Sequence, residues 1–193
     1  MKNNRSLVKL HLGCGTIAPE GWINIDGSWN AWLAKYSLLK FFLKKIGIIN
    51  QDLLNIPWPK NILVHNLTKP LPFKSNSIDF IYSSHTIEHI YLYQTQNLLK
   101  ECFRVLKPGG VLRIVVPDLY KYAKLYLSDQ KIRTEDGLST KADLFLASLL
   151  VSSPSPKGLL VFRMYNYLND TNSHKWMYDK QSLTYWFKWA GFF

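Results

Sequence analysis

Two glycines and one aspartate near the start of the chain could together bind a nucleoside. Gly13 and Gly15 follow an apolar run typical of a β-strand, and Asp26 ends the next such run. A glycine turn after a strand lets a ligand approach the backbone, because no Cβ stands in the way. Free N–H groups in such a turn favour polar atoms, and a carboxylate at the next strand tip can accept both ribose hydroxyls. These three residues therefore predict a nucleoside-binding turn.

The same turn nearly matches the fingerprint of dinucleotide-binding proteins, with Ala18 in the place of the third glycine. That fingerprint requires a helix whose N-terminus faces the pyrophosphate, and an acidic residue about twenty positions further on. Only residues 16–21 separate Gly15 from Trp22, and Pro19 is one of them. Because so short a segment cannot supply the helix, we expect a nucleoside without a pyrophosphate.

The stretch HTIEH, residues 85–89, has the spacing of a zinc-binding motif found on helices of some proteases. Here the pattern begins where a strand ends, and no distant glutamate can be singled out as a further ligand. We therefore expect no metal site. His85, His89 and the distant His174 are instead candidate catalytic bases, while Glu88 either lines a polar pocket or serves the structure.

Five short runs rich in β-branched and aromatic residues predict the strands that position these side chains. They lie at residues 8–12, 22–26, 62–65, 77–84 and 111–116. The segment before the last run predicts a helix that the turn KPGG ends. Its apolar residues recur at helical spacing: Leu98, Leu99, Cys102, Val105 and Leu106. A helix between parallel strands forms a right-handed crossover, so we expect an α/β fold with its ligand at the carboxyl ends of the strands.

Two segments fall outside this alternation of strands and helices. Residues 29–47 predict a basic amphipathic helix, which either packs on the core as a lid or contacts a membrane surface or an anionic partner. Residues 119–175 predict an insert or lid with two helical patterns, LYKYAKLYL and KADLFLASLLV, separated by the loop SSPSPKG from later residues. Such an insert often shapes a substrate pocket.

The last residues predict a helix that Asp179 caps and Gly191 ends. Its buried side is expected to carry Leu183, Trp186, Phe187 and Ala190.

Size and composition suit a single domain. The chain has 193 residues, of which 47% are hydrophobic, and this is enough for one core. The formal net charge of +11 predicts attraction to anionic partners, but the lysines are spread along the chain, so the nucleic-acid signal is not strong. Cys14 and Cys102 match no metal spacing, and the N-terminus has no apolar run of signal-peptide length. We expect a cytoplasmic protein in which Cys14 is a packing residue.

Four segments, in this order, resemble the class I S-adenosylmethionine (SAM) dependent methyltransferases, particularly their small bacterial members. They are LHLGCG, GWINIDGS, HNLTKPLPFKSNSIDFIYSSHTIEHI and ECFRVLKPGGVLRIVVPDL, and they cover about residues 7–119. The resemblance implies a Rossmann-like, three-layer α/β fold with a mostly parallel sheet. It further implies one methyltransferase-like domain over residues 1–193 and SAM as the cofactor.

The resemblance also implies roles for individual residues. The cofactor would be bound by Gly13, Cys14 and Gly15 at its methionine part, by Asp26 at the ribose, by Asn66 and Leu67 at the adenine, and by Ser83, Ser84 and His85 beside the sulfonium.

Three features depart from the family's pattern. His11 and Asn66 stand where acidic residues are common, so weaker binding of the cationic amine end is expected. The first crossover is too short for the usual helix, and the usual final antiparallel strand pair is expected to be missing. The fold is then either reduced or covered at its sheet edge by a partner.

These observations lead us to expect SAM-dependent methyl transfer, by in-line displacement, to an anionic small-molecule or glycan-like acceptor. A degenerate methyltransferase fold that binds SAM or serves as a scaffold is the alternative, and RNA methylation ranks third. Peripheral membrane contact, and a homodimer through the sheet edge or the aromatic C-terminus, are partner hypotheses that stay open.

Overall fold

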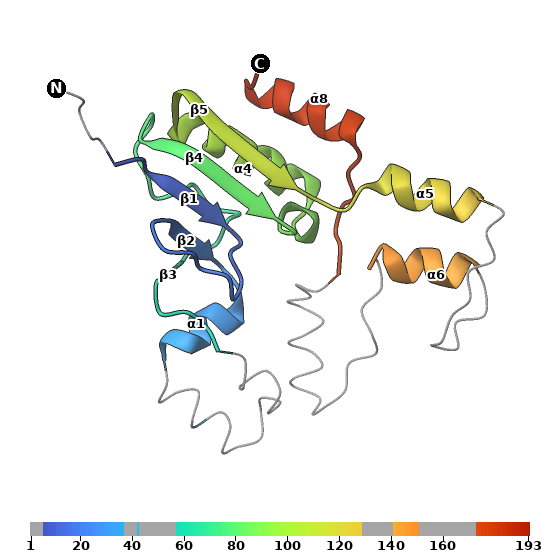
Figure 1. Cartoon of the computed structure of the whole chain (residues 1–193), viewed down its shortest axis with the longest axis horizontal. Coiled ribbons are helices and arrows are strands. Elements are labelled where there is room, and N and C mark those ends of the chain that lie inside the picture. The colour runs from blue at the N-terminus through green and yellow to red at the C-terminus, as the bar shows by residue number, and fades with distance from the viewer. Residues whose placement is uncertain (1–5, 37–41, 43–56, 129–140, 151–172) are drawn as a thin grey trace.

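One parallel sheet organises the computed structural model, which describes residues 6–36, 42, 57–128, 141–150 and 173–193. Its five strands are β1 Lys9–Leu12, β2 Ile23–Asp26, β3 Ile62–Val64, β4 Ile78–Ser84 and β5 Leu106–Val115. Every pairing between them is parallel, in the order β3-β2-β1-β4-β5 (Figure 1). The predicted α/β class with a parallel sheet is confirmed. Because the strand order reverses at β1, a crevice is expected at the carboxyl ends of β1 and β4.

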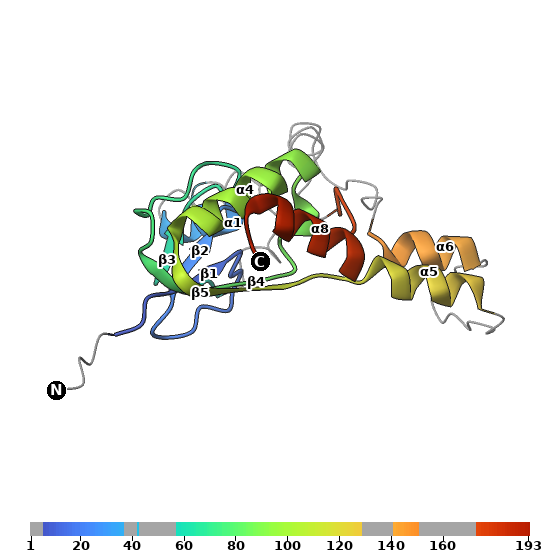
Figure 2. The ribbon, with the colours of Figure 1, turned by 90° about the horizontal axis from the view of Figure 1, so that it is seen from above.

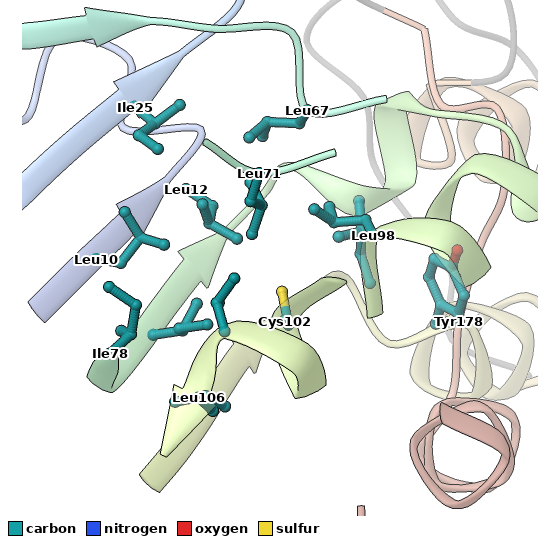
Figure 3. Close-up of a cluster of buried hydrophobic side chains, with 13 residues drawn as sticks. Leu10, Leu12, Ile25, Leu67, Leu71, Ile78, Leu98, Cys102, Leu106 and Tyr178 are labelled. Atoms are coloured by element: carbon teal, nitrogen blue, oxygen red, sulfur yellow. The ribbon is translucent and has the colours of Figure 1, made fainter. Parts of the chain in front are cut away.

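Helix α4 (Leu92–Val105) covers one face of this sheet. Its residues Leu98, Leu99, Cys102 and Val105 are buried, which confirms the predicted helical spacing. Leu98, Cys102 and Val105 belong to one cluster with the strand residues Leu10, Leu12 and Ile25 (Figure 3). Each fully buried aliphatic side chain of this kind contributes roughly 1.5–3 kcal/mol of transfer free energy. The sheet and α4 therefore form the core that holds the strand ends in place.

The predicted end of this helix and the predicted start of β5 were wrong. The helix ends at Val105, because Leu106 has extended backbone angles (φ −68°, ψ 139°) and already pairs with Ile78. The next pair joins Phe80 to Val111, so the KPGG segment lies within β5 as an irregularity of the register. A proline fits there because edge strands and bulges tolerate a missing backbone N–H.

Helix α8 (Lys180–Ala190) begins and ends as predicted. The Asp179 side chain accepts a hydrogen bond from the Ser182 N–H, and Gly191 ends the helix with a φ of 107°. Leu183 and Trp186 pack against the core, and Figure 2 shows α8 on the same side of the sheet as α4. The aromatic C-terminal helix is therefore part of the fold.

The insert after β5 contains the two predicted helices, α5 (Leu119–Leu127) and α6 (Lys141–Ser148). They lie side by side beyond the end of β5 (Figures 1 and 2), and the rings of Tyr126 and Phe145 stack between them at 5.0 Å. The loop SSPSPKG lies outside the described residues. Among the described residues after β5, strand-like pairing is limited to a parallel bridge between Asp118 and Tyr178. The missing antiparallel pair therefore stays a prediction.

The helix predicted over residues 29–47 begins at Trp29 as expected, but it is interrupted at Tyr36. Helix α1 spans Trp29–Lys35 and ends because Tyr36 leaves the helical region (φ −116°, ψ 72°), its N–H bonding the Leu33 carbonyl in a tightened last turn. Apart from residue 42, the rest of the predicted helix lies outside the described residues.

None of the helices in the described part of the chain combines the length and apolar character that crossing a membrane requires.

An ion pair on α4 holds the loop before β4. The Arg104 guanidinium donates to both carboxylate oxygens of Glu101 at 2.8 and 2.7 Å, and to the carbonyls of Leu71 and Phe73. Glu101 in turn accepts the Leu71 N–H at 2.7 Å. The Arg104 guanidinium lowers the pKa of Glu101 below its ordinary value.

Replacing Glu101 by glutamine is expected to lower the free energy of unfolding by about 1–3 kcal/mol at neutral pH. Since the folded pKa is lowered, the stabilisation is present above the ordinary glutamate range and is lost as the pH falls through the folded pKa. Urea unfolding of wild type and variant at neutral and acidic pH measures this. The exposed Glu20→Gln is the control, and a gap that does not close in acid would contradict the prediction.

Candidate functional site

The turn after β1 is tied to the end of β2. The Cys14 N–H donates to the Ile25 carbonyl at 3.0 Å, and the Gly15 N–H donates to Asp26 Oδ2 at 2.8 Å. The expectation that these N–H groups are free for a ligand was therefore wrong at Cys14 and Gly15, because β2 already uses them. The Asp26 carboxylate instead fixes the shape of the turn through its bond to the Gly15 N–H. The glycine turn and Asp26, which were both predicted to bind the ligand, therefore lie together.

The two glycines of this turn have different roles. A Cβ at Gly13 would lie 2.1 Å from Thr86 Oγ1, so the missing side chain makes room for Thr86 and not for a ligand. A Cβ at Gly15 would meet no atom within 4 Å. Both residues have positive φ angles, 65° and 54°. The open approach predicted for both glycines is thus found at Gly15 alone.

The Asp26 carboxylate retains unused acceptor capacity. It is 7% exposed, and its two oxygens accept the N–H groups of Gly15 and Ser28, each at 2.8 Å. An ionised carboxylate offers about four lone-pair positions, so about two remain for a ligand. The backbone bonds fix its direction, and neighbouring hydroxyls on a ribose would fit the remaining positions.

The predicted adenine-facing residues lie after β3. Asn66 is exposed, and its Oδ1 accepts both the N–H and the hydroxyl of Thr68 at 2.9 Å. The Leu67 side chain is buried in the core cluster (Figure 3), so only its backbone is available to a ligand. The adenine contact of these two residues stays a prediction.

The end of β4 lies beside the turn, since Leu12 pairs with Ser83. Ser83 is 1% exposed, and its hydroxyl has no hydrogen-bond partner among the described residues. A buried hydroxyl without a partner costs roughly 1–3 kcal/mol, which a polar ligand atom would recover. Ser84 is half-buried, whereas His85 is exposed with a φ of 50°, unusual for a residue with a side chain.

The three predicted bases lie close together although 85 residues separate the last two. His89 ends the 3₁₀ helix η1 (Ile87–His89), and His85 lies two residues before that helix. The His89 and His174 rings are 4.9 Å apart. Glu88 is completely buried, and its Oε1 lies 3.2 Å from His85 Nδ1. Burial, with His89 nearby, lowers the pKa of His174, which favours the neutral form of its ring. Their action as bases remains a prediction.

His11 lies on the face of β1 opposite to that of Leu10 and Leu12, which belong to the core cluster. It is 6% exposed, and its ring packs 5.2 Å from Tyr82 and 6.4 Å from Trp22. Burial lowers its pKa from the ordinary value of 6.5, although Asn24 and Asp26 oppose this. His11, which was expected to weaken cofactor binding, therefore packs with the rings of Trp22 and Tyr82.

His11 is expected to make the protein less stable in mild acid. Because its folded pKa is lowered, the unfolded chain takes up a proton first as the pH falls below 6.5, and the free energy of unfolding falls with it. His11→Phe keeps a ring but cannot titrate, so its stability should change less between about pH 7.5 and about pH 5. Urea unfolding at both pH values measures this, and an unchanged pH slope would refute it.

Two residues of the site were missed by reasoning from the sequence. Thr86 contacts Gly13 and donates to the Ser84 carbonyl at 3.0 Å, and no local pattern marks such an approach. Ser28 donates its N–H to Asp26 and caps α1 by accepting the Ala31 N–H. A serine before a helix is a recognisable capping signal, so Ser28 could have been found.

The residues present fit a nucleoside cofactor. Gly15 faces open space, Asp26 has acceptor positions left, and the Ser83 hydroxyl is without a partner among the described residues. All three lie at the carboxyl ends of neighbouring strands, where the strand order reverses.

Comparisons with known proteins agree with this arrangement. A family model described as a methyltransferase domain matches residues 10–114. A probable S-adenosylmethionine-dependent methyltransferase of Mycolicibacterium smegmatis is 34% identical over 61 residues, which are 32% of this chain and 23% of that protein. The chain therefore spans about a quarter of the length of this curated relative.

A solved structure shares the fold. A SAM-dependent methyltransferase from Archaeoglobus fulgidus superposes with a TM-score of 0.50 and 16% identity, over 97% of this chain and 61% of that one. One from Mesorhizobium loti gives a TM-score of 0.48 and 14% identity, over 96% of this chain and 74% of that one.

Proposed function

Because the chain belongs to the methyltransferase domain family, whose model matches more than half of it, we propose that it is a SAM-dependent methyltransferase. The observation that carries this proposal is the pairing of Gly15 with Asp26. One residue leaves room for a ligand, and the other presents a fixed carboxylate beside that space.

Asp26, Gly15 and Ser83 would each contact a different part of SAM. Asp26 would accept hydrogen bonds from the ribose hydroxyls, and Gly15 would let the cofactor approach the backbone. The Ser83 hydroxyl would donate to a polar atom of the cofactor and thereby gain the partner that it lacks among the described residues. SAM, when bound, supplies a methyl group on a sulfonium leaving group.

The main task left to the protein is alignment of the acceptor with that methyl group. Correct orientation contributes roughly 7–11 kcal/mol, whereas a general base adds about 10²–10⁴ in rate. His174 or His89 would take the proton of an acceptor hydroxyl or protonated amine. The net charge of +11 favours an anionic small-molecule or glycan-like acceptor, and α5 and α6 would border its pocket.

Calorimetry of the full chain with SAM and with its demethylated product tests the proposal. We expect each ligand to bind with a stoichiometry of one per chain. If wild-type protein binds neither, the proposal is wrong.

A degenerate methyltransferase fold that binds SAM without turnover is the second candidate. It is favoured by His11 and Asn66, because the first packs among aromatic rings and the second bonds to Thr68, so neither offers a carboxylate. Labelled SAM incubated with the protein and a cell extract separates the two candidates. Labelled product supports the enzyme, and tight binding without product supports the second candidate.

A further inference from the structure

A group of nitrogen and oxygen ligands lies beside the crevice. Glu88, His89 and His174 each offer one ligand atom, and these atoms all lie within 4.8 Å of one another. Ligand atoms held about 2.0–2.2 Å from a metal are roughly 3–4 Å apart, so small side-chain rotations would complete the geometry. Three of the five histidines of the chain, His85, His89 and His174, gather here.

The Glu88 carboxylate needs a positive partner. It is 0% exposed, and neither of its oxygens has a hydrogen-bond partner among the described residues. His85 Nδ1 lies 3.2 Å from Oε1 but without hydrogen-bond geometry, and the His85 side chain is 63% exposed. A buried carboxylate without compensation is costly, since paired or metal-bound charges are the usual form in interiors.

Each of the two histidines offers one ring nitrogen to this group of ligand atoms. His89 Nδ1 lies 3.3 Å from the Ser173 carbonyl, which can only accept, so this bond places the proton on Nδ1 and leaves Nε2 free. His174 Nδ1 is buried and has no partner among the described residues. A backbone carbonyl behind a ligating histidine is a common support of metal sites.

The two segments that carry these ligands are fixed to each other. The N–H groups of Lys175 and Trp176 donate to the Glu88 carbonyl at 2.6 and 3.2 Å. The fully buried Tyr178 donates to Thr95 Oγ1 at 3.1 Å, and Thr95 donates to the Ile87 carbonyl at 3.3 Å. The cluster is therefore held by the fold and does not depend on mobile surface side chains.

We propose that Glu88, His89 and His174 bind a divalent transition-metal ion, with a further position open to His85 or to an exogenous oxygen. Two imidazoles and one carboxylate form a ligand set that suits zinc, cobalt or iron. The cysteines do not compete for the ion, because burial raises the pKa of both thiols to about 12. In this proposal His174 takes the place of the distant ligand that the HTIEH pattern lacks, in contrast to the expectation from the sequence that no metal binds.

The site lies next to the proposed cofactor turn. Thr86, two residues before Glu88, donates to the Leu12 carbonyl at 3.4 Å and fills the space beside Gly13. An ion here would hold an acceptor oxygen and lower the pKa of its hydroxyl near the transferred methyl group. It would thereby replace the role of His89 or His174 as a base, because a nitrogen that binds the ion cannot also take a proton. This role of the ion rests on the proposed function, whereas metal binding itself does not.

The site is tested by calorimetric titration of the untagged full chain with Zn²⁺, after a chelator has removed any bound metal. Binding of Co²⁺ is followed by its visible absorption spectrum. We expect one ion per chain. Glu88→Gln and His174→Asn should weaken binding by at least about 10²-fold, while His65→Asn, outside the cluster, should bind as wild type. X-ray absorption of the Co²⁺ form should show nitrogen and oxygen neighbours without sulfur.

The melting temperature with and without Zn²⁺ can also be compared for variants that are less stable than wild type. The metal should raise the melting temperature of wild type and His65→Asn, but not of Glu88→Gln, His89→Asn or His174→Asn. No binding by wild type, a sulfur ligand, or unchanged binding by the cluster variants would overturn the proposal. SAM calorimetry on the stripped protein reports separately on the proposed function, so failure of one proposal is distinguishable from failure of the other.

Discussion

Replacing Asp26 by asparagine is expected to weaken SAM binding by about 10²–10⁴-fold. Each hydrogen bond to a charged group contributes roughly 1.5–3 kcal/mol, and the variant alters two such bonds to the ribose. Asparagine also sets an amide donor against the N–H of Gly15 or Ser28, both of which now donate to the carboxylate. Calorimetry with SAM and its demethylated product measures the loss.

Asp79→Asn is the matched control for this variant. Asp79 accepts the Val8 N–H at 2.8 Å and pairs with Lys107 at 2.7 Å, at the opposite ends of β1 and β4. Its replacement should lower the melting temperature without changing SAM affinity. If Asp26→Asn binds SAM as tightly as wild type, Asp26 does not hold the ribose.

Replacing Gly13 by alanine is expected to lower the free energy of unfolding by about 2–5 kcal/mol. A positive φ costs a residue with a side chain about 1–2 kcal/mol, and crowding in a packed site adds about 1–3 kcal/mol. The crowding arises because the new Cβ would lie 2.1 Å from Thr86 Oγ1. Urea unfolding measures the change, and adding Thr86→Gly should recover the part due to crowding.

Gly15→Ala separates folding from binding in the same turn. Its φ of 54° carries a similar backbone cost, but its Cβ would meet no protein atom within 4 Å. This variant should therefore be less destabilised than Gly13→Ala, by about the 1–3 kcal/mol of crowding, while SAM affinity falls. If Gly15→Ala is the less stable of the two, the roles assigned to the glycines are wrong.

Local patterns predicted the elements well where each element follows a simple period. The apolar residues of α4 recur at helical spacing and are buried, and Asp179 and Gly191 mark the two ends of α8. Short apolar runs likewise located all five strands. These features depend on neighbours within a few residues, so they can be read along the chain.

Boundaries were predicted less well where pairing partners decide them. Leu106 fits the helical period of α4, but it pairs with Ile78 and starts β5. Pro108 then lies inside a strand, as the irregular register of β4 with β5 allows. The competition between helix and sheet at Leu106 is settled by a strand nearly thirty residues away.

The sequence by itself determined the α/β class, the parallel sheet and the family, because periodicity and ordered motifs are local properties. Only the tertiary structure decided that Gly13 serves Thr86 while Gly15 stays open, and that His11 lies among Trp22 and Tyr82. It also decided that His174 meets Glu88 and His89. The physical reason is that these contacts join segments distant in the chain, and their geometry depends on how strands and helices pack, which no local pattern records.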